Sequence, residues 1–235
     1  MSIPYEVKVY LRNPIAAPKE LKAIHPLGKV SRANPSPEDK RKRKRADELL
    51  DTTQQAPVIT DHGKAIAESA TIIDYLKHTY SETGKEFDLN NSYWSNYSEG
   101  SLMLFMQMSL VFVISGQQAP WFVKPVISGF VNTVKSTYLN RQVQSSVNYM
   151  ESELGKTSHG WFSGTSEPGP GDFMMCYPIN VLINTDRMPE IEIGENLRKW
   201  MKAVEARPAF QRAKARLEEE ERKAKDASPG TVSKL

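Results

Sequence analysis

Residues 56–77 read Ala-Pro-Val-Ile-Thr-Asp-His-Gly-Lys-Ala-Ile-Ala-Glu-Ser-Ala-Thr-Ile-Ile-Asp-Tyr-Leu-Lys, and they predict a β-hairpin that continues into an amphipathic helix. Residues 58–60 are β-branched and typical of a strand, and residues 61–64 have the composition of a tight turn. A returning strand is expected at 65–67. From residue 69 to residue 80 the apolar positions recur at helical spacing, which indicates a helix with one buried face.

The junction between the predicted hairpin and helix carries two features that suit a binding site. Pro57 opens the first strand, where a missing backbone N–H is tolerated. Glu68 and Ser69 stand at the start of the helix, where free N–H groups and the helix dipole favour a carboxylate ligand. An isolated Glu-Ser pair at this position is more often ordinary helix capping. On the residues alone, capping and ligand binding both stay open.

The order Pro-Val-Ile, Asp-x-Gly, Ile-x-Glu-Ser-x-x-Ile-x-x-Tyr-Leu resembles the end of the thioredoxin-like domain of glutathione transferases. The resemblance implies that Pro57 is cis and that Ala56 binds the cysteinyl backbone of glutathione. Glu68 and Ser69 would hold the γ-glutamyl end of that ligand. Lys29, which ends a Pro-x-Gly-Lys segment, would lie near the glycyl carboxylate.

A second stretch, Tyr-Trp-x-x-Tyr-x-Glu-Gly-Ser-Leu-Met from residue 93, resembles the fungal, yeast-type members of the same family. It opens a long helical pattern at 92–115, whose broad apolar coverage predicts burial on most of its surface. In the family, the end of this helix near Tyr97 and Ser98 borders the pocket for a hydrophobic co-substrate. The apolar run 102–114 is too short to span a bilayer.

Later patterns predict more helices, and two glycines affect their ends. A helix is expected at 127–154, with Gly155 at its C′ position. A further helix at 172–183 begins with Asp172 in a capping-box pattern. Because Gly169 replaces the usual Ser or Thr there, we expect a cap weaker by a few tenths of a kcal/mol.

The fold class expected from these patterns is α+β, with a truncated thioredoxin-like α/β domain followed by an all-α helical bundle. The expected divisions are a glutathione-binding domain at 1–80, a linker at 81–91, the helical domain at 92–225 and a flexible tail at 226–235.

Two departures from the family pattern concern the first part of the chain. In the family, a first strand and helix carry the Ser, Tyr or Cys that activates the glutathione thiol. Here only residues 1–4 precede the strand expected at 5–12, so no residue of this sequence matches the catalytic position. The second departure is the polar segment 30–55, which interrupts the family pattern and is expected to be disordered.

Segment 30–55 has two interpretations. Its first residues can be encoded by a splice-donor sequence, its last by a splice-acceptor ending, and its coding length is a multiple of three, so we favour a retained intron. The alternative is a nuclear-localisation or nucleic-acid-binding patch at the basic run 40–45. No aromatic residue is interleaved with that run.

The composition is that of an ordinary globular protein, with 39% hydrophobic residues and a formal net charge of +3. Cys176 is the one cysteine, so no intrachain disulfide is possible, and it is expected to pack in a helix rather than react. No metal-ligand spacing and no signal peptide are recognisable, and a cytoplasmic location is expected.

The resemblance implies a detoxifying transferase that conjugates glutathione, its co-substrate, to small hydrophobic electrophiles or reduces organic peroxides. Such enzymes are usually homodimers, and neither nucleic acid nor a membrane span is expected. The first alternative is a non-catalytic module that binds glutathione or another protein. The second is a nuclear nucleic-acid binder that uses the basic run 40–45.

Overall fold

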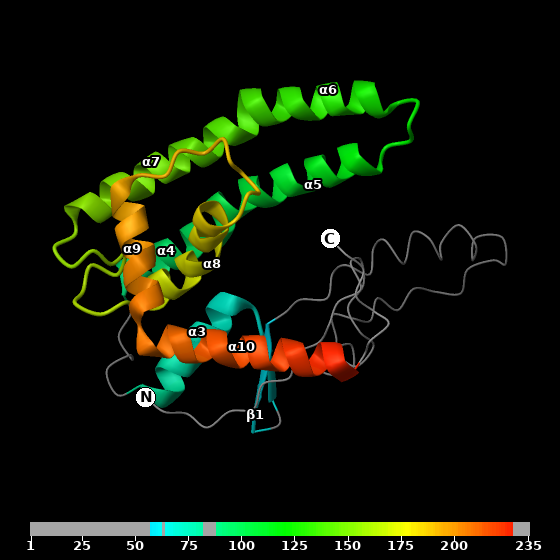
Figure 1. Cartoon of the computed structure of the whole chain (residues 1–235). Helices are drawn as coiled ribbons and strands as arrows, with labels where there is room; N and C mark the ends of the chain where they lie inside the picture. Colours follow the sequence, from blue (N-terminus) through cyan, green and yellow to red (C-terminus); the bar gives the residue numbers. More distant parts are fainter. Residues whose placement is uncertain (1–56, 63, 82–87, 228–235) are drawn as a thin grey trace, which may run out of the picture. The chain divides into compact units, whose positions relative to one another are not determined.

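The computed structural model describes residues 57–62, 64–81 and 88–227 (Figure 1). It contains two compact units, of which the helical unit spans residues 86–207. The other unit includes the β-hairpin, helix α3 and helix α10 (Pro208–Ala227). The expectations for Lys29, Ala56, the strand at 5–12, segment 30–55 and the end of the tail fall outside the described residues.

The predicted hairpin and helix are confirmed. Strand β1 (Val58–Asp61) pairs antiparallel with β2 (Lys64–Ala67), with Val58 opposite Ala67. Helix α3 (Ser69–Tyr80) follows directly and ends one residue before Ser81. Ile66 of β2 and Ile72 of α3 are buried, as the alternating and helical periods require.

The helical unit is built on two long antiparallel arms, followed by two shorter helices (Figure 1). The first arm consists of α4 (Leu89–Tyr97), the π-helical segment η3 (Ser98–Met103) and α5 (Leu104–Gln118). The second arm consists of α6 (Lys124–Val134), η4 (Lys135–Leu139) and α7 (Asn140–Lys156). The shorter helices are α8 (Pro170–Asn184) and α9 (Glu195–Ala206).

The core of this unit lies where α8 packs against α4 and α9 packs against α7 and α8. Three aromatic rings pack together in this core. The ring centroids of Trp94 and Phe162 are 4.5 Å apart, and those of Phe162 and Trp200 are 5.4 Å apart. The largest side chains with almost no exposed surface include Trp200, Phe162, Leu102, Leu139, Met150, Met175, Ile179, Leu197 and Met201.

The expectation that the first long helix is buried on most of its surface is wrong for α5. Leu104, Leu110 and Val111 are exposed to 47%, 42% and 62%, because α5 continues beyond the helices that cover α4. The two α-helices and the π segment form one continuous helix, Leu89–Gln118. By length and composition alone, this helix is long and apolar enough to cross a membrane.

Gly155 does not end α7, which continues to Lys156 and is followed by Thr157 in an extended conformation. The Thr157 hydroxyl donates to the Leu154 carbonyl, so one of the last free carbonyls is satisfied without a left-handed residue. A Cβ atom on Gly155 would lie 3.2 Å from Nδ2 of Asn196, and close packing against the start of α9 therefore explains the glycine.

Asp172 joins the start of α8 to the preceding loop and to α9. Its carboxylate accepts hydrogen bonds from the backbone N–H groups of Phe162, Ser163 and Gly169, and from the indole N–H of Trp200, at 2.8–3.0 Å. The side chain is 1% exposed. The half of the capping box expected of Asp172 is therefore present, because the Gly169 N–H is among its donors.

The other half of the α8 cap comes from α4. The Oδ1 atom of Asn91 accepts a hydrogen bond from the Gly171 N–H at 3.0 Å, in place of the hydroxyl that Gly169 lacks. Asp88 holds Asn91 in position by accepting from the Asn91 backbone N–H and side-chain amide, at 3.1 and 2.6 Å. The expectation of a weak cap considered only residue 169 and did not include Asn91, which is remote in the sequence.

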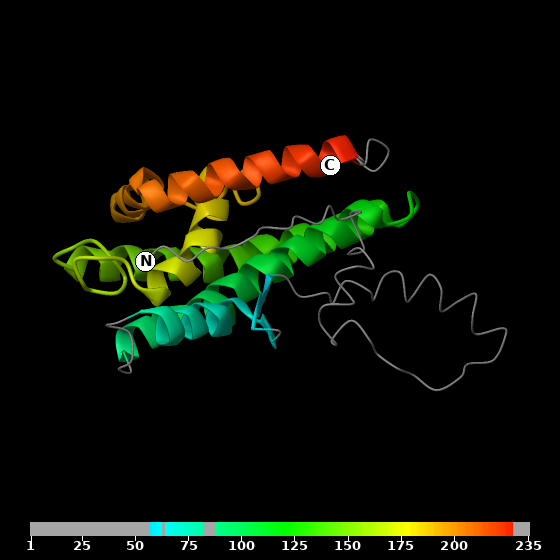
Figure 2. The ribbon, with the colours of Figure 1, turned by 90° about the horizontal axis from the view of Figure 1, so that it is seen from below.

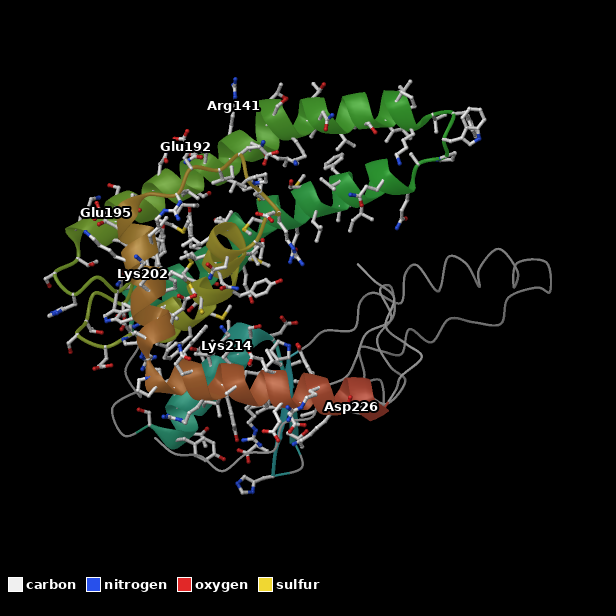
Figure 3. The ribbon with its side chains drawn as sticks, viewed as in Figure 1. Arg141, Glu192, Glu195, Lys202, Lys214 and Asp226 are labelled. Carbon is white, nitrogen blue, oxygen red and sulfur yellow. The ribbon has the colours of Figure 1, made fainter. Side chains whose placement is uncertain are left out.

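Helix α9 begins in the same way, with Gly194 at the N-cap position and a cap supplied by α7. The carboxylate of Glu151 accepts from the backbone N–H groups of Asn196 and Leu197, at 2.7 and 2.9 Å. Two turns earlier on α7, Gln144 exchanges two hydrogen bonds with the backbone of Glu192. Figure 3 shows Glu192 and Glu195 where this connection runs beside α7 and enters α9.

Candidate functional site

The hairpin–helix junction brings together three of the predicted site residues. The register of β1 and β2, continued by one residue, places Pro57 opposite Glu68 at the same end of the hairpin. Ser69 is the first residue of α3. The Glu68 side chain is exposed and makes no capping hydrogen bond to α3, so the capping interpretation of this glutamate does not hold in this structure.

The backbone at Glu68 is in an unusual conformation. Its φ is 73°, a region that costs a residue other than glycine on the order of 1–3 kcal/mol. The Glu68 carbonyl accepts the first helical hydrogen bond, from the Ile72 N–H at 2.9 Å. The turn at Glu68 is therefore fixed by both the strand pairing before it and the helix after it. The first N–H groups of α3 have no partner within the helix and receive no cap from the Glu68 side chain.

Asp61 fastens the hairpin to α3. Its Oδ2 atom accepts hydrogen bonds from the hydroxyls of Tyr75 and Tyr80, at 2.7 and 2.6 Å. These bonds stabilise the carboxylate, so the pKa of Asp61 lies below its usual value of 3.8. They also oppose ionisation of the phenols, and the bond to Asp61 raises the pKa of Tyr80 to about 12.

Tyrosine titration should report this contact. In an ultraviolet absorbance titration we expect Tyr80 to ionise near pH 12, and Asp61→Asn should return it toward 10.0. The raised pKa means that the contact is fully stabilising below pH 10 and weakens as the pH rises through 12. The lowered pKa of Asp61 makes the same contact weaken in acid, below pH 3.8. An unchanged titration curve for Asp61→Asn would contradict the assignment.

A cavity of about 360 Å³ lies in the helical unit, between the first arm and the end of α8. Its walls are mostly apolar and rich in methionine, which adapts to ligands of varied shape. The lining residues are Met103, Met106, Gln107, Ser109, Leu110 and Val113 of the first arm, Tyr177 and Val181 of α8, and Asp186, Arg187 and Met188 beyond it. The few polar groups can orient a mainly apolar molecule of small size.

Tyr97 and Ser98, the residues expected beside the co-substrate, do not line this cavity. Tyr97 packs in an aromatic cluster, with its ring centroid 5.4 Å from that of Trp94 and 5.5 Å from that of Tyr149. Burial raises the pKa of the Tyr97 hydroxyl, which therefore stays protonated at neutral pH.

Ser98 has a structural role that its sequence position does not reveal. Its side chain is 1% exposed and donates a hydrogen bond to the Met174 carbonyl at 2.8 Å. Pro178 stands four residues after Met174 inside α8 and has no N–H to donate to that carbonyl. The Ser98 hydroxyl thus satisfies the backbone oxygen that the proline leaves without a helical partner.

Cys176 lies on α8 and is half-buried. Burial, followed by the charge of Glu205, raises the pKa of its thiol, which is therefore protonated at neutral pH. A protonated thiol is a poor nucleophile, in agreement with the expectation that Cys176 packs rather than reacts.

The sequence analysis did not predict the cavity, although the residues of its main wall form a recognisable pattern in the sequence. Met103, Met106, Leu110 and Val113 follow one another at intervals of three or four residues along a single helical face. A stripe of this kind is more often core than pocket. Here α8 ends at Asn184, and Asp186, Arg187 and Met188 after it line the same cavity as this stripe.

The comparisons with known proteins agree with one another. The family model of the glutathione S-transferase N-terminal domain matches residues 1–79. Glutathione S-transferase 3 of Schizosaccharomyces pombe is 28% identical over 225 residues, which cover 93% of this chain and 80% of the relative. Glutathione S-transferase 1 of Saccharomyces cerevisiae is 22% identical, with 91% of this chain and 85% of the relative covered.

Among solved structures, a glutathione S-transferase from Actinobacillus pleuropneumoniae has a TM-score of 0.58 to this chain. It is 23% identical, and the match covers 91% of this chain and 81% of that one. This likeness shows the fold, a thioredoxin-like N-terminal domain with a helical C-terminal domain, and thereby confirms the expected fold class.

Proposed function

Because this chain is a glutathione transferase-family protein, we propose that it transfers glutathione to small hydrophobic electrophiles. The observation that carries the proposal is the hairpin–helix junction, where Pro57, Glu68 and the start of α3, which the Glu68 side chain does not cap, meet. The finer assignments below are proposals as well. They concern the residues that bind glutathione, the co-substrate and the assembly of the enzyme.

Glutathione suits the junction chemically. Its γ-glutamyl end carries a carboxylate and an ammonium group. The carboxylate can accept hydrogen bonds from Ser69 and the first N–H groups of α3, with support from the helix dipole. The exposed carboxylate of Glu68 can pair with the ammonium. Lys29 and Ala56 are proposed to bind the remainder of the tripeptide, as the family resemblance implies.

The methionine-rich cavity is proposed to take the co-substrate, in place of a pocket at Tyr97 and Ser98. In conjugation, the glutathione thiolate forms a bond to an electrophilic carbon, and a leaving group such as chloride departs with the bonding electrons. A free thiol has a pKa of about 8.5, so a nearby group must stabilise the anion for rapid turnover at neutral pH. The identity of that group stays open, and reduction of organic peroxides is a second reaction of the same thiolate.

The other expectations from the family are proposals of the same kind. They comprise a homodimeric assembly and a cytoplasmic location, with glutathione as co-substrate rather than a metal cofactor. Among the described residues, no group of three or more His, Cys, Asp or Glu side chains could hold a metal ion. A non-catalytic glutathione-binding module is the alternative, and the following experiment separates it from an enzyme.

The proposal is tested by measuring glutathione binding by calorimetry and conjugation of a chloronitrobenzene by absorbance. We expect Glu68→Ala to weaken glutathione binding by about tenfold or more, because a hydrogen bond to a charged group is lost. Glu68→Gln keeps a hydrogen-bond acceptor without the charge, and its affinity for glutathione should lie between those of the unaltered chain and Glu68→Ala. Glu195→Ala, which removes an exposed glutamate from the start of α9, is the matched control and should change neither quantity.

Each result has a separate meaning. Binding without conjugation by the unaltered chain would favour the non-catalytic module. Glutathione binding that is insensitive to Glu68→Ala would reject the proposed site. No binding of glutathione at all would reject the function.

A further inference from the structure

The loop that joins the two long arms exposes an unusual amount of apolar surface. We define the hairpin tip as residues 118–130, which end α5, form the connecting loop and begin α6. Figures 1 and 2 both show α5 and α6 side by side, running beyond α7, α8 and α9 of the same unit. The exposed fractions at the tip are 85% for Trp121, 67% for Phe122, 76% for Val126 and 60% for Phe130.

Charge is almost absent from this part of the chain. Lys124 is the one charged residue between Glu99 and Lys135 in the sequence. It lies at the tip, two residues after Phe122, and is exposed. The other polar side chains between Glu99 and Lys135 are uncharged. Water therefore faces a long charge-free surface with a single cation at its far end.

The exposed apolar residues of α5 lie on the side of the helix that faces away from its buried residues. Met106, Ser109 and Gly116 mark its buried side. Val111 is 62% exposed and lies on the opposite side, since successive residues are about 100° apart around a helix. A helix that is apolar all round is normally enclosed by protein or by lipid. Few of the described residues cover the side of α5 on which Val111 lies.

We propose that the hairpin tip inserts into the interface of a lipid bilayer. Trp121 would lie at the level of the headgroups, where tryptophan is enriched, and Phe122 and Val126 would reach the first part of the acyl chains. Lys124 has a long aliphatic stem, which lets its ammonium return to the lipid phosphates while the stem stays in apolar surroundings. The insertion is shallow and does not span the membrane, as for other interfacial segments.

The form of the tip favours a bilayer over a second copy of the chain. Protein interfaces have an apolar centre with a polar rim, and the surface at the tip has no ionised rim apart from Lys124. Its exposed apolar residues, Trp121, Phe122, Val126 and Phe130, come from the connecting loop and the start of α6, so they lie at the projecting end of a hairpin. A fluid bilayer can surround such an end without a complementary shape.

Insertion would also have a consequence for the cavity. Residues 103–113 of the first arm line it, and the same arm leads directly into the tip. Membrane contact would therefore bring the cavity close to the phase in which apolar molecules dissolve. The proposed contact is independent of the transferase reaction, and it can be tested without substrate.

The test is co-sedimentation of the full chain with phosphatidylcholine vesicles, at low salt and at about 0.5 M salt. We expect binding to the neutral vesicles that persists at high salt, because apolar burial supplies most of the affinity. The double variant Trp121→Ser/Phe122→Ser should bind at least about tenfold more weakly. The matched control Leu89→Ser/Leu217→Ser removes two exposed apolar side chains outside the tip and should bind normally.

Tryptophan emission gives a second measurement on the unaltered protein. Trp94 and Trp200 are buried, whereas Trp121 is almost fully exposed, so vesicles should shift the emission to shorter wavelength and Trp121→Phe should abolish the shift. Failure of the full chain to bind neutral vesicles would overturn the proposal, as would equal binding by the double variant and the control. Loss of a dimer in the double variant, without vesicle binding by the parent, would assign the tip to a second copy instead.

Discussion

Replacing Asp172 with alanine should lower the free energy of unfolding of the helical unit by about 4 kcal/mol, because the change leaves buried hydrogen-bond donors without an acceptor. Four donors converge on this carboxylate, from Phe162, Ser163, Gly169 and Trp200. All four tryptophans of the chain lie within residues 86–207, so urea unfolding followed by tryptophan emission reports on this unit alone.

Two variants make the Asp172 measurement specific. Asp172→Asn keeps the shape and one acceptor oxygen, but it places an amide N–H where Oδ2 accepts from Ser163 and Gly169, so an intermediate loss is expected. Lys202→Ala removes an exposed charged side chain from α9 of the same unit and should change stability by less than about 0.5 kcal/mol (Figure 3). A loss for Asp172→Ala as small as that of Lys202→Ala would mean that water replaces the carboxylate without penalty.

The second large effect is expected at Gly169, where sequence and structure make opposite predictions. A serine at an N-cap position normally stabilises a helix. Here a Cβ atom on residue 169 would overlap the side chain of Asn91, which is buried and held by Asp88. We therefore expect Gly169→Ser to destabilise the unit by about 2 kcal/mol, the typical penalty of overpacking.

A double-mutant cycle distinguishes this explanation from general intolerance of side chains at residue 169. Asn91→Ala alone removes the remote cap, and we expect a loss of about 1–2 kcal/mol. In Asn91→Ala/Gly169→Ser the serine has room to supply the missing acceptor, so the double variant should be more stable than the sum of the two single losses implies. Additive losses, measured by urea unfolding, would contradict the view that the two side chains compete for one place.

Local patterns predicted much of this fold. The hairpin 58–67, the helix after Glu68 and the approximate positions of the later helices all follow from periods of two and 3.6 residues and from turn chemistry. The π-helical segments η3 and η4 have no such period, and neither was predicted.

What the sequence could not supply depends on residues far apart in the chain. The family resemblance placed Ser98 beside a pocket, whereas in the structure its hydroxyl donates to the Met174 carbonyl. That carbonyl needs a partner because of Pro178, which lies 80 positions after Ser98, so the local sequence around Ser98 could not reveal this role. The exposure of Val111 likewise depends on where α8 and α9 stop, which no property of α5 records. Of the candidate site, Pro57, Glu68 and Ser69 could be predicted from one continuous motif, whereas the cavity required three separate segments to be placed together.

The remote caps of α8 and α9 affect how the helical unit folds. Each of these helices begins after a glycine, and each takes an acceptor for its first N–H groups from an earlier helix, Asn91 on α4 or Glu151 on α7. Neither helix has an N-cap side chain of its own that could accept from its first N–H groups, so its nucleation should depend on docking. Amide protons in the first turns of α8 and α9 should therefore exchange with solvent only when the whole unit opens, whereas those of α10, outside this unit, should exchange at their own, faster rate.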